Sequence, residues 1–169
     1  GIGMNAMNSF TMKCLTELGY DYIMPSPELT GVQLASIAEH SALADRMLIG
    51  IHGRTPLMQL LHCPIKEHKG CQNCMGIAGA VTDEAGRVFP LVNIRYPDNC
   101  LVRMLNCRTT DLIDLFDKIP QTAGYVLNFV GEQIDEVTER IAAANEAMNG
   151  KRQTQYPNST RGHWMRKVE

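Results

Sequence analysis

The sequence lacks the features that mark secreted and membrane proteins. It contains no run of 18 apolar residues, which excludes a membrane-spanning helix. Its N-terminus has neither the basic start nor the apolar stretch of a signal peptide. A net charge of −2 shows that the whole chain is not a polycation built to bind nucleic acid. We therefore expect a cytoplasmic protein.

Standard catalytic signatures are also missing. The sequence has no Gly-x-Ser-x-Gly, no His-Glu-x-x-His and no phosphate-binding glycine loop, which argues against the common hydrolase, zincin and nucleotide-binding classes. Six cysteines are too few for a small disulfide scaffold, and four of them lie between positions 63 and 100. This clustering favours metal binding over disulfide formation.

The composition is that of a folded domain, with 44% hydrophobic and 20% charged residues in 169. The charge is unevenly distributed, because residues 151–169 carry a net charge of +4 and residues 1–150 a net charge of −6. The last 19 residues are therefore expected to form a separate basic tail, in which Trp164 and Met165 could pack back on the domain.

Short apolar segments alternate with helical patterns in the first 51 residues. The sequence predicts strands over 1–8, 22–24 and 47–51, with helices that begin at Ser9 and Thr30. The predicted core faces of these helices are Phe10, Cys14 and Leu18, and Leu34, Ile37 and Ala38. Such alternation is typical of parallel strands joined by right-handed crossovers, and so of an α/β fold.

The regular order breaks after Cys63 and returns near Thr110. Residues 81–89 suggest two strands that turn at Asp83 to Gly86. A helix over 111–118, a strand over 125–130 and a helix over 132–148 follow. The last helix has a predicted buried stripe of Ile134, Val137, Ile141, Ala144 and Met148. We expect residues 1–150 to form a partial TIM-type barrel, cut from a longer chain, with a β insertion at about 60–107.

Four cysteines surround the predicted hairpin with the spacing C-x7-C-x2-C-x25-C. They are Cys63, Cys71, Cys74 and Cys100. Four thiolates suit tetrahedral zinc, which the two-residue knuckle slightly favours, or an iron–sulfur cluster. Cys107 could replace Cys100 as a ligand, and Cys14 is assigned to the core. His62 and His68 flank the cysteines but are left out of the ligand set.

A series of motifs in this order resembles a known family. They are Gly53-Arg54-Thr55-Pro56-Leu57-Met58, His62-Cys63-Pro64-Ile65, the Cys71/Cys74 pair, Thr82-Asp83 with Gly86, Phe89-Pro90-Leu91, Cys100 and Asn106. The series resembles peptidase family U32, the collagenase-like proteases, as do Ser26-Pro27-Glu28-Leu29 and Thr160-Arg161-Gly162-His163. The resemblance implies a TIM-type barrel with a cysteine-bound metal centre.

The same resemblance allows several activities. It implies either a collagen-degrading peptidase or an iron–sulfur protein that assists hydroxylation of RNA bases or of a quinone precursor. The chain lacks the family's Gly-Ser/Ala-Met-Cys signature, and it has Asp83-Glu84 where members usually show Asp-Arg. We therefore expect the isolated chain to lack protease activity. A non-catalytic module held by structural zinc is the alternative.

Candidate site residues follow the predicted strands. Glu28 is the candidate catalytic carboxylate, because TIM-type barrels place their chemistry at the strand ends; the alternative is a helix-start carboxylate. Asn5, His52 and Arg54 are candidates for binding a polar or anionic substrate. Expected partners are the rest of the parent barrel or a second copy, with RNA or a peptide as substrate.

Overall fold

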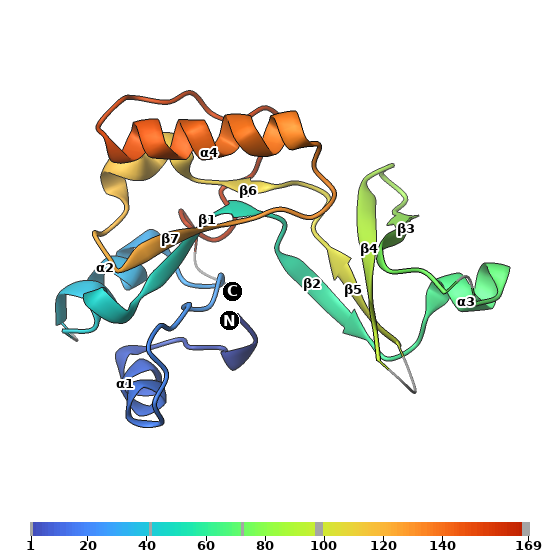
Figure 1. Cartoon of the computed structure of the whole chain (residues 1–169), viewed down its shortest axis with the longest axis horizontal. Helices are drawn as coiled ribbons and strands as arrows, with labels where there is room; N and C mark the ends of the chain where they lie inside the picture. The colour runs from blue at the N-terminus through green and yellow to red at the C-terminus, as the bar shows by residue number, and fades with distance from the viewer. Residues whose placement is uncertain (1, 41, 72, 97–99, 167–169) are drawn as a thin grey trace.

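A computed structural model describes residues 2–40, 42–71, 73–96 and 100–166, and it has two sheets (Figure 1). The first sheet has the order β6-β1-β7 and the second the order β2-β5-β4-β3. None of the helices in these ranges is long and apolar enough to cross a membrane. The two sheets belong to two regions, here called the parallel region and the insertion.

The parallel region contains most of the helices. Its elements are η1 (Ile2–Met4), α1 (Ser9–Glu17), α2 (Gly31–His40), η2 (Ala44–Arg46), β1 (Leu48–Gly53), β6 (Thr110–Asp111), η3 (Ile113–Lys118), β7 (Gly124–Asn128) and α4 (Ile134–Met148). Strands β1 and β7 run parallel, and parallel bridges join Ala6 to Pro25 and Ile23 to Met47. Four parallel segments thus lie side by side, and α1, α2 and α4 follow three of them.

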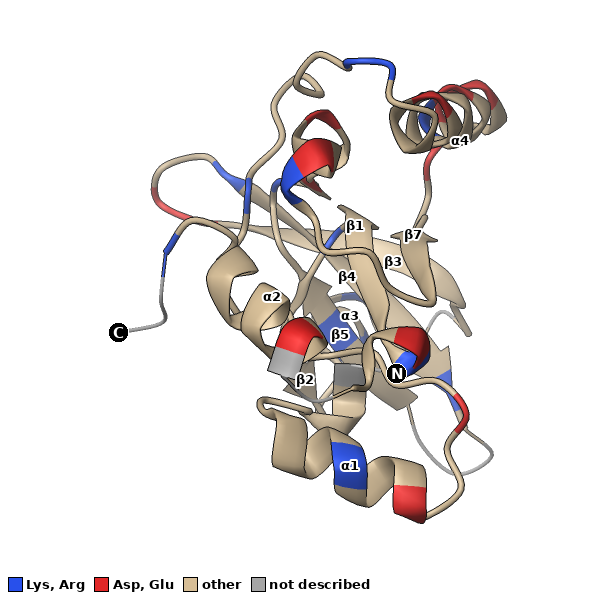
Figure 2. Ribbon diagram, turned by 90° about the vertical axis from the view of Figure 1, so that its left-hand side faces the viewer, with Lys and Arg blue, Asp and Glu red and all other residues tan. Residues whose placement is uncertain are grey.

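The core of the parallel region lies between these strands and the helices. Met12, Met47, Ile51 and Ile113 have at most 1% of their surface exposed. Neither β1 nor β7 carries a Lys, Arg, Asp or Glu, as Figure 2 shows. Uncharged, apolar strands of this kind are typical of a parallel sheet that is covered by helices.

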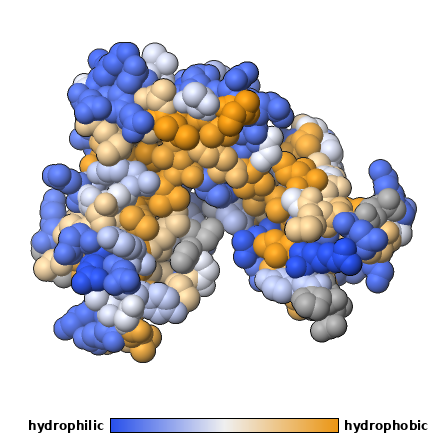
Figure 3. Space-filling model, in the orientation of Figure 1, coloured by the Kyte–Doolittle hydropathy of each residue, from blue (hydrophilic) through white to orange (hydrophobic). Residues whose placement is uncertain are grey.

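The insertion is an antiparallel sheet with one short helix. Its elements are β2 (Pro56–Leu60), α3 (Pro64–Lys69), β3 (Gly76–Thr82), β4 (Val88–Arg95) and β5 (Cys100–Leu105). The predicted hairpin is confirmed, since β3 and β4 are joined by a turn in which the Gly86 amide donates to the Asp83 carbonyl. Figure 3 shows a notch between the insertion and the parallel region.

The fold class is confirmed as mixed α/β, but the structure has no closed barrel in the described residues. Strand β6 pairs antiparallel with β1, through His52 opposite Asp111. A TIM barrel needs parallel neighbours on both sides of every strand. The described parallel segments number four, whereas a TIM barrel closes with eight parallel strands, so the expected barrel is not supported.

Two helices bury faces other than those predicted. In α1 the buried residues are Met12 and Leu15, while Phe10 and Leu18 are more than 70% exposed. In α4 the buried residues are Arg140, Ala143, Ala144 and Ala147. Of the predicted stripe, Ala144 is buried and Val137 half-buried, whereas Ile134, Ile141 and Met148 are exposed. Both helices carry apolar residues on more than one face. The alanine face allows close approach to the domain, so α4 packs through its small residues.

The first strand was also placed wrongly. Residues 2–4 form a 3-10 helix, and the strand pairing of the described residues before α1 is the single bridge at Ala6. Asn8, not Ser9, caps α1, because its side chain accepts a hydrogen bond from the Thr11 amide at 2.8 Å. The prediction for α2 was correct: the Thr30 hydroxyl caps the Gln33 amide, and Leu34, Ile37 and Ala38 are buried.

The C-terminal segment returns to the parallel region. Trp164 is only 8% exposed, and its carbonyl accepts a hydrogen bond from the Gly31 amide at 3.0 Å. A Cβ atom at Gly31 would lie 2.6 Å from the Trp164 ring, so glycine is needed for this close packing. Met165, by contrast, is 71% exposed. The bridge between Thr160 and Thr110 also holds the segment, so Trp164 is its buried apolar anchor and Met165 is not.

Candidate functional site

The four candidate metal ligands lie around one cavity in the insertion. Cys63, Cys71, Cys74 and Cys100 all line a space of about 550 Å³. They come from three places in the chain: the start of α3, the loop between α3 and β3, and the first residue of β5. The fold thus brings together sulfurs that lie up to 37 positions apart in the sequence.

Local sequence explains the shape of the loop that carries two of these cysteines. Pro64 occupies the first turn of α3, where a missing amide is tolerated. Gly70 ends the helix with a φ of 73°, a conformation that favours glycine. Asn73 and Gly76 also have positive φ, so the chain turns tightly on both sides of Cys74.

Asn93 of β4 lies beneath the cavity and contacts Cys74 directly. Its side-chain nitrogen donates to the Cys74 carbonyl at 3.1 Å and approaches the Cys74 sulfur at 3.2 Å. The carbonyl can only accept, so the amide nitrogen must face it. Asn93 is 5% exposed, and its Oδ1 has no partner among the described residues. This buried amide therefore holds Cys74 in place through contacts with both its carbonyl and its sulfur.

The described cysteines do not form a compact coordination site for a metal ion. Nowhere in residues 2–40, 42–71, 73–96 and 100–166 are three His, Cys, Asp or Glu side chains placed to hold one ion. The expected four-cysteine site is therefore not seen as a compact group. What the structure shows is four thiols around one cavity that would have to converge on a metal.

The remaining cysteines lie apart from the cavity. Cys107 is not among the residues that line it, and its thiol approaches Asn106 Oδ1 at 3.5 Å. Cys100 is therefore better placed than Cys107. Cys14, which was assigned to the core, is exposed on α1, because Met12 and Leu15 occupy the buried face.

The cavity also contains charged groups that are not sulfur ligands. His62 Nε2 lies 3.0 Å from a Glu67 carboxylate oxygen, and both side chains are more than half exposed. Lys66 and Arg95 line the same space. These positive groups would partly offset the negative charge of bound thiolates.

A second cavity contains the candidate catalytic residue. Glu28 lines a space of about 250 Å³, here called the strand-end pocket, together with Thr55, Asn106, Arg161 and Trp164. Pro25 and Ile49, which belong to neighbouring parallel segments, line the same pocket. The structure thus places Glu28 in a cavity where the chain leaves a parallel segment.

His52 is buried and bound to a carboxylate. Its Nδ1 lies 2.7 Å from Asp111 Oδ2, and the two side chains are 1% and 0% exposed. The rings of Phe129 and Tyr156 pack against the imidazole at centroid distances of 5.2 and 5.6 Å. His52 therefore joins β1 to β6 in the interior.

Asn5 and Arg54 occupy different surroundings. Asn5 is exposed and has a φ of 46°. Arg54 is half-buried, and its guanidinium donates to the carbonyls of Asn106 and Cys107 at 2.9 and 2.7 Å. These bonds connect the two chain segments that lead into and out of the insertion.

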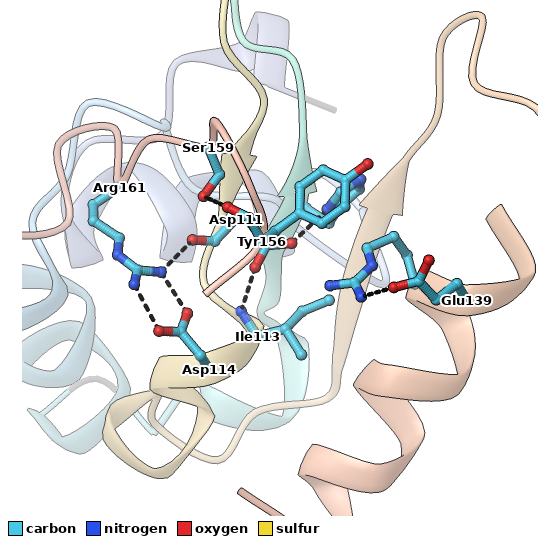
Figure 4. A network of polar contacts seen from close by, with 9 residues as sticks. Asp111, Ile113, Asp114, Glu139, Tyr156, Ser159 and Arg161 are labelled. Atoms are coloured by element: carbon cyan, nitrogen blue, oxygen red, sulfur yellow. Dashed lines mark hydrogen bonds and ion pairs between the residues drawn. The ribbon is translucent and has the colours of Figure 1, made fainter. Parts of the chain in front are cut away.

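Sequence reasoning missed Asp111, which organises the polar network in Figure 4. Its Oδ1 accepts from the Ile113 amide at 3.3 Å, and its carbonyl accepts from Arg161 at 2.8 Å. Arg161 also forms a bidentate ion pair with Asp114. The available signal was a carboxylate directly before the apolar pair Leu112-Ile113, because a charge within an apolar run needs a buried partner.

Tyr156 of the C-terminal segment belongs to the same network, because its ring packs against His52, the partner of Asp111. The Arg140 guanidinium lies 4.5 Å from the centre of its ring. Burial raises the pKa of the Tyr156 phenol, the Glu136 carboxylate adds to the increase, and Arg140 opposes it. The phenol therefore stays protonated and neutral at physiological pH.

Comparisons with known proteins give no match: no family model, no curated protein and no solved structure is significantly similar to this chain.

Proposed function

We propose that the chain is the metal-binding part of a protein of the U32 type, with Cys63, Cys71, Cys74 and Cys100 as ligands. The observation that carries this proposal is that all four line one cavity. These four come from three separate places in the chain, while Cys14 and Cys107 do not line the cavity.

The donor set fits a metal in kind. Four thiolates are a common ligand set for structural zinc, and they leave no position open for a substrate. The amide of Asn93 would supply the hydrogen bond that metal-bound sulfurs usually receive from a neighbouring group. Zinc bound in this way would tie the α3 loop to the start of β5.

The insertion needs such a link. No residue of β2, β3 or α3 is buried, and the buried residues of its sheet lie in β4 and β5. Small units with little buried apolar surface usually depend on a metal or disulfides for stability. A structural metal centre is therefore the function that the geometry supports best.

The spacing of the thiols favours a second candidate, an iron–sulfur cluster. The described cysteines do not converge as closely as one zinc ion needs, and clusters accept the same four thiolates at wider spacing. Such a centre would suit the hydroxylation-assisting members of the family that the sequence resembles. In either case, we expect the isolated chain to have no collagenase or gelatinase activity.

Metal analysis of protein purified without oxygen tests the proposal. We expect about one zinc per chain and no colour, or iron and sulfide with a broad visible absorption band. Cys71→Ser should lose most of the metal, whereas Cys14→Ser, the matched control on the exposed face of α1, should retain it. Full metal content in Cys71→Ser, or metal-free wild-type protein after reconstitution with zinc and with iron and sulfide, would refute it.

A further inference from the structure

The strand-end pocket has the size of a site for a small ligand. Its volume of about 250 Å³ lies just below the range of typical ligand pockets, so it suits one amino-acid side chain or a small amine. Residues from distant parts of the sequence form it: the segment after Met24, the start of β2, and the C-terminal segment at 161–164.

One part of the pocket wall is apolar and buried. Pro25, Leu29, Leu112 and Trp164 line it, and all four are buried. The indole of Trp164 is held by its packing on Gly31 and by the hydrogen bond between their backbones. A rigid aromatic wall also attracts cations, and tryptophan does so most strongly among the aromatic side chains.

The charges at the pocket favour a positively charged ligand. Arg161 is already paired with Asp114 and bound to the Asp111 carbonyl, so its positive charge is neutralised within the protein. The carboxylate of Glu28 forms no ion pair or hydrogen bond with the described residues, and its residue is exposed. Glu28 is the one acidic residue among the described residues that line the pocket, which also include His163, so the pocket presents a single unpaired carboxylate beside its apolar wall.

We infer that the strand-end pocket binds a primary amine or guanidinium on a short apolar stem, with Glu28 as the counter-ion and Trp164 as the wall. Two sources carry this group: a free small amine, and a lysine or arginine side chain of a peptide. This inference does not depend on the metal centre, because no cysteine lines the strand-end pocket.

Fluorescence provides a direct test, because Trp164 is the single tryptophan in the chain. The probes are benzylamine, benzyl alcohol and benzoate, which are similar in size but carry positive, zero and negative charge. We expect benzylamine to change the Trp164 emission saturably, benzyl alcohol to bind at least tenfold more weakly, and benzoate not to bind. Acetylated and amidated Gly-Lys-Gly, compared with Gly-Gln-Gly, distinguishes a peptide side chain from a free amine.

Variants show whether Glu28 provides the charge. Glu28→Gln should weaken benzylamine binding at least tenfold and leave benzyl alcohol unchanged, while Glu84→Gln, at the exposed hairpin turn, should change neither. Benzoate binding as tight as benzylamine binding, an unaffected Glu28→Gln, or no saturable change with any probe would overturn the inference. Repeating the titration after chelation should give the same result, so a failed metal proposal leaves this outcome intact.

Discussion

The parallel region and the insertion differ in how much of each is buried. The contiguous core cluster draws its fully buried members from residues 6–51, 112–147 and Trp164, and none from β2, β3, β4 or β5. The insertion contributes Leu91, Leu101, Val102 and Leu105 as a separate small group. One region is therefore stabilised by its own packing, and the other depends on additional links.

The links between the regions are polar or limited to single side chains. Arg54 holds the two connecting segments together, and Ile77 of β3 reaches Gly131, where a Cβ would lie 2.1 Å from the isoleucine methyl group. Gly131 has a φ of 86°, a backbone conformation that favours glycine. The effect of a mutation on the free energy of unfolding should therefore differ between the two regions.

The largest effect is expected from Asp111→Ala in the parallel region. The change removes the partner of buried His52 and the acceptor of the Ile113 amide, which should lower the free energy of unfolding by about 3–5 kcal/mol. Urea denaturation followed by circular dichroism measures it. Asp117→Ala, at an exposed position of the 3-10 helix η3 that follows β6, is the control. A loss below about 1 kcal/mol would show that the buried pair adds little to stability.

Truncating apolar strand residues compares the two regions directly. Ile51→Ala in β1 removes a fully buried side chain and should cost about 3 kcal/mol. Val81→Ala in edge strand β3, where the side chain is 42% exposed, should change stability by less than about 1 kcal/mol. Equal losses in the same urea titration would contradict the difference in packing.

Removing the proposed metal should affect one region only. After chelation, we expect amide exchange in β3 and β4 to become at least tenfold faster, because the link between the α3 loop and β5 is lost. Exchange in β1 and β7 should not change. Hydrogen exchange with mass spectrometry measures both in one sample, and uniform acceleration would indicate that the regions unfold together.

The smallest effect concerns the hairpin turn. The amide of Arg87 is the main cause that lowers the pKa of Asp83, and the Arg87 side chain and the Ala85 amide add to it. Because the folded pKa is lowered, this contact stabilises the turn above the ordinary pKa and is lost as the pH falls through the lowered value. NMR shifts of the Ala85 and Arg87 amides should report this loss. Asp83→Asn should abolish the transition, and Glu84→Gln should keep it.

Sequence patterns predicted the elements better than the contacts. The hairpin at Asp83 and the Thr30 cap depend on residues that are close in sequence, so the local sequence was enough to predict them. The faces of α1 and α4 could not, because apolar residues on several sides leave the choice to tertiary packing. The pairing of His52 with Asp111 spans 59 positions and depends on β6 lying antiparallel to β1. Spacing did indicate which cysteines share a cavity, but not how closely their sulfurs approach.

The way in which the insertion is attached to the parallel region affects how such a protein can change over evolution. Pro56 pairs with Leu105, the Asn106 amide donates to the Thr55 carbonyl at 2.9 Å, and Gly53 lies opposite Thr110. The chain therefore leaves the parallel region and re-enters it at one point. A segment attached in this way can be shortened, exchanged or acquired as a module, since a short turn between β1 and β6 would preserve the strand order of its host.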